Sequence, residues 1–169
     1  MKKQNTTLYN IVFPVWLLFA MPQFWIVALP ANWIIDFLVI FFTARRLTMD
    51  SPGKFALKSV WLTWLAGFFA DAAGGIIMLY DDFAGPSAKT PFGAWFNSTV
   101  GRAIYNPFDN IFAFLWTLLS VLVSAVLIYL LNRSIYLHDA DLDPTKAKKI
   151  ALSLALFTAP YLFFVPTMF

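Results

Sequence analysis

Long apolar runs alternate with short polar segments along this chain. A helix needs about 20 mostly apolar residues to cross the hydrocarbon core of a bilayer, and five runs fit this requirement. The pattern therefore predicts an all-α fold: one transmembrane domain over residues 1–169, built as a polytopic helical bundle. The predicted spans are about 8–29, 31–44, 59–80, 107–131 and 150–169.

The segments between the predicted spans differ in length. Only Pro30, Ala31 and Asn32 are available to turn the chain between the first two spans, which predicts a tight hairpin. The one long connection, residues 81–106, is predicted to be external. The sequence also predicts two helix starts, each with an N-cap followed by proline in the first turn: Asn106-Pro107 and Asp143-Pro144.

The external loop has a helical pattern of its own. Phe92, Phe96, Val100 and Ile104 recur every four positions, and polar side chains lie off that stripe. We expect a short helix lying in the outer membrane interface. This helix would either cover the bundle or serve for gating or partner docking.

The distribution of Lys and Arg predicts the orientation, because basic residues near span ends stay on the cytoplasmic side. Five spans with a cytoplasmic N-terminus and an external C-terminus leave only Lys89 and Arg102 outside. The other ten of the 12 basic residues then lie in the cytoplasm: Lys2, Lys3, Arg45, Arg46, Lys54, Lys58, Arg133, Lys146, Lys148 and Lys149.

Composition narrows the class of protein further. Apolar residues make up 60% of the 169 and charged residues 12%, against roughly a quarter in soluble domains. There is no cysteine, which excludes disulfide scaffolds, zinc-thiolate sites and thiol catalysis. The small net charge of +3 disfavours nucleic-acid binding. No motif predicts a metal or other cofactor, and the single histidine, His138, lies in a cytoplasmic loop away from the buried serines, so we do not expect an enzyme.

Asp71 is the most unusual residue of the predicted bundle, since it falls near the middle of the third span. A carboxylate at the bilayer centre costs at least about 2.5 kcal/mol, so it must be neutral, paired or in a wet cavity. Gly67 and Gly75 share its helical row, and Ala70 and Gly74 lie on the adjoining row. Small residues allow close helix approach, which predicts that Asp71 faces protein rather than lipid.

Asp36 is predicted to lie about five residues from the outer end of the second span, near enough to the interface to stay hydrated. Counting by helical rise brings further polar side chains to a similar depth on other spans. We therefore predict an outward-facing polar pocket, for an ion or a substrate, that is lined by Gln23, Asp36, Asp71, Thr117 and Tyr161.

The fourth span carries a stripe of small and hydroxyl residues at spacings of three and four: Asn110, Ala113, Thr117, Ser120 and Ser124. Such a stripe is typical of the contact line between two packed helices, and packing alone explains it. Its hydroxyls could also hydrogen-bond a protonated Asp71. Prolines within spans, such as Pro160, release the carbonyl four residues earlier, here that of Leu156.

Two functions from different classes agree with these features. The first is an accessory or scaffold subunit of a larger membrane complex, in which the small-residue faces and the external loop are contact surfaces. The alternative is a small transporter or channel component that binds a cation or proton at Asp71. In either case we expect the lipid bilayer and a membrane-protein partner or second copy as partners, and a bacterial cytoplasmic membrane as the location.

Overall fold

The computed structural model describes residues 25–138 and 142–166. Over these residues the chain is helical, with four segments long and apolar enough to cross a membrane. The elements in chain order are α2 (Trp25–Arg46), α3 (Pro52–Met78), α4 (Tyr80–Ala84), α5 (Pro91–Thr99), η2 (Val100–Ile104), α6 (Ile111–Leu137), α7 (Pro144–Phe157) and η3 (Tyr161–Phe164).

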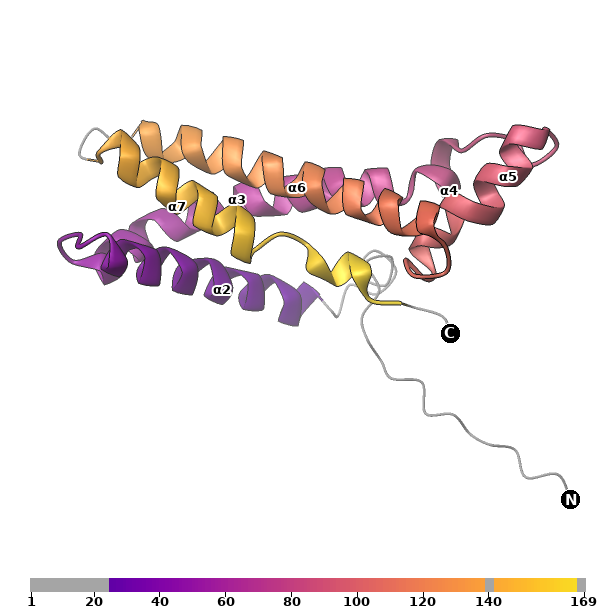
Figure 1. Ribbon diagram of the computed structural model, residues 1–169. Helices are drawn as coiled ribbons and strands as arrows, with labels where there is room; N and C mark the ends of the chain where they lie inside the picture. The colour runs from indigo at the N-terminus through magenta and orange to yellow at the C-terminus, as the bar shows by residue number, and fades with distance from the viewer. Residues whose placement is uncertain (1–24, 139–141, 167–169) are drawn as a thin grey trace, which may run out of the picture.

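The four long segments form a bundle in which each helix has two main neighbours. α3 packs on α2 and α6, and α7 packs on α6 and α2 (Figure 1). Side chains also tie neighbouring helices by hydrogen bonds to backbone carbonyls. The Trp64 indole donates to Leu29 O at 3.1 Å, and the Trp116 indole donates to Ile77 O at 2.9 Å.

The hairpin predicted around Pro30 is wrong, because α2 runs through this residue from Trp25 to Arg46. A proline inside a helix loses one backbone hydrogen bond, whereas a turn among apolar residues would leave several polar groups unpaired in lipid. The last five residues of the predicted first span, 25–29, therefore belong to α2. The rest of that span lies outside the described residues.

Two further helix starts differ from the prediction. α3 begins at Pro52 rather than at residue 59, and takes Lys54 and Lys58 into its first turns. Long lysine side chains allow this because the charged end can reach water. α6 begins at Ile111 instead of Pro107. Its N-cap is Asn110, whose side chain accepts from the backbone N–H groups of Phe112 and Ala113, at 3.0 Å each.

The last span is interrupted. α7 starts as predicted, with the Asp143 side chain accepting from Thr145 N at 2.9 Å and from Lys146 N at 3.1 Å. It ends at Phe157, and the chain resumes as η3 after Pro160. The break follows from Pro160, which cannot donate a backbone hydrogen bond and disfavours helical geometry at the residue before it.

The loop between α3 and α6 contains a short helix, α5, which extends away from the bundle in Figure 1; its location in the membrane interface stays a prediction. Of the predicted stripe, Phe96 and Val100 are 8% and 7% exposed, whereas Phe92 is 60% exposed. Phe96 makes an edge contact with Trp116 of α6, with ring centroids 5.8 Å apart. The loop is thus attached to the bundle through aromatic contacts.

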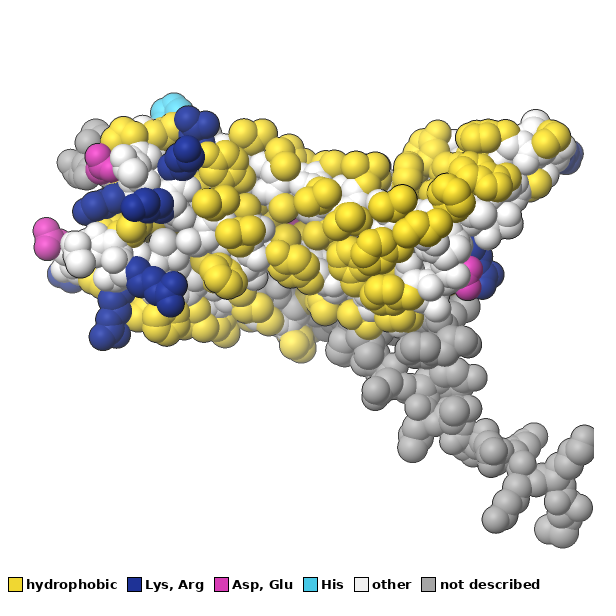
Figure 2. Space-filling view, in the orientation of Figure 1, with side chains coloured by type: hydrophobic (Ala, Val, Ile, Leu, Met, Phe, Trp, Pro, Cys, Tyr) yellow, Lys and Arg dark blue, Asp and Glu magenta, His cyan; other side chains and the backbone are white. Residues whose placement is uncertain are grey.

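Apolar side chains cover much of the face of the bundle that Figure 2 shows. On α6, exposed residues recur at helical spacing, each 46% to 54% exposed: Leu115, Leu119, Leu122, Val126 and Leu130. This surface is suited to lipid contact. Lys and Arg side chains gather at one end of the bundle, called the basic end here, which carries Arg45, Arg46, Lys54, Lys58, Arg133, Lys146, Lys148 and Lys149.

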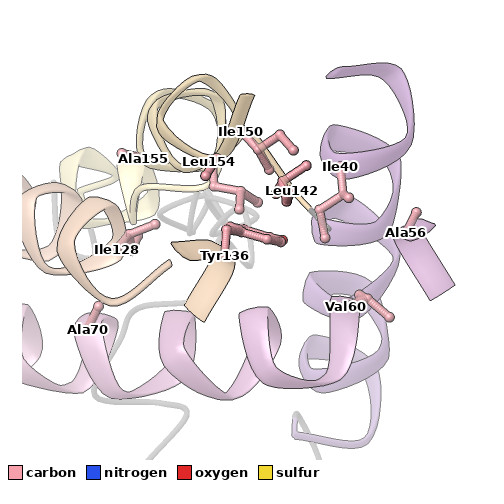
Figure 3. Packing of buried hydrophobic residues seen from close by; sticks show 11 residues of the cluster. Ile40, Ala56, Val60, Ala70, Ile128, Tyr136, Leu142, Ile150, Leu154 and Ala155 are labelled. Atoms are coloured by element: carbon pink, nitrogen blue, oxygen red, sulfur yellow. The ribbon is translucent and has the colours of Figure 1, made fainter. Parts of the chain in front are cut away.

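The largest buried cluster lies toward the basic end. Tyr136 is 1% exposed at its centre and is surrounded by aliphatic residues of the other three helices, among them Ile40, Val60 and Leu154 (Figure 3). Its ring also lies 5.9 Å from that of Phe55. The hydroxyl group of Tyr136 is the polar part of an otherwise apolar core.

Candidate functional site

Asp36 lies near the middle of α2, 11 residues after Trp25 and 10 before Arg46. It is 6% exposed. The prediction of a hydrated Asp36 near the end of a span is therefore wrong, and the reason is the continuation of the helix through Pro30. The structure places this carboxyl inside the bundle.

Asp71 lies 19 residues after the start of α3 and seven before its end, so it is further from the middle of its helix than predicted. Its side chain is half-buried. The Oδ1 atom is inaccessible to solvent and has no hydrogen-bond partner among the described residues. A buried carboxyl oxygen without a partner is costly, and such groups are uncommon outside functional sites.

The two carboxyl groups approach each other across the α2–α3 contact. A Cβ atom placed on Gly67 would lie 3.9 Å from Asp36 Oδ2, so the Asp36 carboxyl rests against the α3 backbone at that glycine. Gly67 is one helical turn from Asp71 on the same face. Asp36 is also close enough to Asp71 to interact with it electrostatically. We refer to Asp36 and Asp71 as the carboxyl pair.

Thr158 is a third polar residue of this region, and the sequence interpretation did not include it. It follows the last residue of α7, and its hydroxyl donates to Leu154 O at 2.9 Å. The same side chain lies close to the Asp36 carboxyl. Pro160, two residues later, is the sequence signal that could have indicated a helix end here.

Other residues of the predicted pocket lie elsewhere. Tyr161 is 51% exposed, and its hydroxyl donates at 2.7 Å to Leu156 O, the carbonyl that Pro160 leaves without its helical partner. Thr117 is buried at the level of Met78, seven residues along α3 from Asp71, and donates to Ala113 O at 3.0 Å. Gln23 lies outside the described residues. Of the four pocket residues within the described part of the chain, the structure brings Asp36 and Asp71 together and places Thr117 and Tyr161 elsewhere.

Apart from Gly67, which faces Asp36 of α2, the predicted packing residues gather along the contact of α3 with α6. The Ser124 hydroxyl donates to Ala70 O at 3.0 Å. A Cβ on Gly74 would overlap with Ser124 Oγ and would lie 2.8 Å from Ser120 O. Gly75 is buried beside Gly74. These contacts fix the register of α3 against α6, and so position Asp71 relative to the rest of the bundle.

This arrangement has a limited chemistry. Ionised carboxylates are strongly disfavoured in low dielectric, and two close together disfavour each other further. A bound proton or cation removes that cost. The end of α7 lies close to Asp36 through Thr158, and the negative end of a helix dipole favours positive charge.

Metal-type ligands do not cluster further around the pair. Within residues 25–138 and 142–166, no group of three or more His, Cys, Asp or Glu side chains could hold a metal ion. No protein-family model matches the chain, and neither a curated protein nor a solved structure matches it.

Proposed function

We propose that this membrane protein binds a proton or a small cation at the carboxyl pair, as a component of a transport or channel assembly rather than as an enzyme. The observation that carries the proposal is the contact of Asp36 with α3 at Gly67, one turn from Asp71. This contact supports one shared site, because it brings the Asp36 carboxyl to the face of α3 that carries Asp71.

The physical support is the cost of leaving the pair charged and empty. On the insertion scale, one charged Asp at the centre of a membrane helix costs about 2.5 to 3.5 kcal/mol. A structural role alone would be served by Asn, which keeps the shape and carries no charge. Two carboxyl groups at one site are suited instead to binding and releasing a proton or a small cation.

The role of an accessory subunit is a second candidate, and the structure changes what supports it. Gly74, Ser120 and Ser124 contact one another within the chain, so they are not free to bind a partner. The segment from α4 to α5 does present apolar side chains: Phe83 is 78% and Phe92 60% exposed. A partner subunit of this chain would bind there.

The proposed function is tested with Asp36→Asn and Asp71→Asn, and with Asp50→Asn as the control, because Asp50 is exposed in the loop between α2 and α3. Each purified protein is reconstituted into liposomes, and infrared difference spectra are recorded across a pH titration. We expect each site variant to remove a band of a protonated carboxyl that the control retains.

Transport is measured on the same liposomes with an internal pH dye. Both site variants should lose proton or cation flux while keeping the helical circular dichroism of the parent. Spectra and fluxes that match those of the parent would contradict the carboxyl-pair function. A stoichiometric partner recovered in mild detergent, and lost on Phe92→Ser, would instead support the accessory role.

A further inference from the structure

A pair of buried hydroxyl groups lies between the carboxyl pair and the basic end. Tyr136 Oη and Thr63 Oγ1 are 2.7 Å apart, and either can be the donor. Both residues are 1% exposed. Thr63 is one turn from Gly67 and two turns from Asp71 on the same face of α3. The hydroxyl pair is therefore next to the carboxyl pair along this helix.

Tyr136 connects this position with the end of the bundle. Its backbone is one residue from the end of α6, among the basic residues, while its ring points into the core (Figure 3). One side chain thus extends from the basic end to Thr63 of α3, one turn from Gly67.

Asn132 adds a polar atom one turn from Tyr136 on α6. It is fully buried, and its amide nitrogen donates to Ile128 O at 2.9 Å. Its Oδ1 atom has no partner among the described residues. A buried carbonyl acceptor with a free lone pair can receive a proton donor such as a hydroxyl group or a water molecule.

The hydroxyls on the other side of Asp71 are already engaged. Ser124, Ser120 and Thr117 each donate at 3.0 Å to a helix carbonyl, those of Ala70, Trp116 and Ala113 respectively. A hydroxyl has one proton to donate, so none of these can pass a proton on without breaking that bond.

Apolar side chains also pack closely on the side of Asp71 away from the basic end. A Cβ on Gly74 would lie 3.3 Å from Cε2 of Phe163, which packs with Val121 and Ala159. The neighbouring cluster contains Met78, Ala103 and Ala113. The described serine and threonine hydroxyls of the α3–α6 contact are thus engaged, whereas on the side of the basic end the Oδ1 atom of Asn132 is an acceptor without a partner among the described residues.

We infer that protons reach the carboxyl pair from the basic end through the hydroxyls of Tyr136 and Thr63. The inference rests on the proposed function, and it specifies the route and the side of access. In each transfer a hydroxyl accepts one proton and donates its own. The carboxyl gains one proton, the solution at the basic end loses one, and no bond to carbon changes.

The test compares two buried threonines on opposite sides of the pair. Thr63→Val removes a hydroxyl on the proposed route, and Thr117→Val removes one of equal burial beyond Asp71. Tyr136→Phe removes the other hydroxyl of the route and keeps the ring. The readout is the rate at which the protonated carboxyl band shifts after the proteins are mixed with D₂O.

We expect Thr63→Val and Tyr136→Phe to slow this exchange about a hundredfold, the lower range for a positioned proton-transfer group. Thr117→Val should exchange at the rate of the parent. An unchanged rate in Thr63→Val, or equal slowing in Thr117→Val, would overturn the route and leave the site intact. A parent protein without a carboxyl band from Asp36 or Asp71 would overturn the proposed function itself.

Discussion

Substituting Gly74 by alanine tests whether the α3–α6 contact depends on a missing side chain. The added Cβ would overlap with Ser124 Oγ and would lie 2.8 Å from Ser120 O. The serine side chain can rotate away, but Ser120 O belongs to the backbone of α6, so the helices must separate. Overpacking of this kind costs about 1 to 3 kcal/mol.

Gly67→Ala is the matched control, since Gly67 is also inside α3 and its added Cβ would meet Asp36 Oδ2 at an ordinary 3.9 Å. Both variants gain the helix propensity of alanine over glycine, about 1 kcal/mol, so that term cancels between them. Gly74→Ala should therefore be about 1 to 3 kcal/mol less stable than Gly67→Ala.

The free energy of unfolding is measured by tryptophan fluorescence as the proteins unfold in mixed micelles of increasing denaturing-detergent fraction. The double variant Gly74→Ala/Ser124→Ala should recover part of the loss, because the contact with Ser120 O remains. Equal stability of Gly74→Ala and Gly67→Ala would refute the close approach of α3 and α6, and with it the placement of Asp71.

Two further predictions concern the ends of the loop between α3 and α6. Burial, and secondarily the charge of Asp82, raises the pKa of Asp81. A raised folded-state pKa means that the stability from this carboxyl is present below pH 3.8 and is lost as the pH rises through the folded value. Asp81→Asn should remove this loss and slow amide hydrogen exchange in the loop at neutral pH. Unchanged exchange would contradict it. Asn110→Ala removes the N-cap of α6 and should cost about 1 kcal/mol in detergent unfolding, whereas Asn110→Asp should retain most of the stability.

The sequence by itself determined the class of the protein and part of its local structure. Apolar runs of membrane length require helices, because no other open structure satisfies backbone polar groups in lipid. Asp143 was identified as an N-cap because its side chain and the following proline act within one turn. The spacing of apolar residues in the loop predicted a helix in the region of α5. The cost of a charge within a span identified Asp71 as a residue that must be neutral, paired or hydrated.

Tertiary structure decided where the helices begin and which side chains meet. The sequence around Pro30 is compatible with a turn or with a continuous helix. Because the helix continues through Pro30, Asp36 lies in the interior of the bundle and not at the end of a span. Helical rise gives the depth of a residue but not the rotation of its helix. The surroundings of Asp71 therefore depend on the close packing of α2 at Gly67 and of α6 at Gly74, which sequence spacing does not reveal.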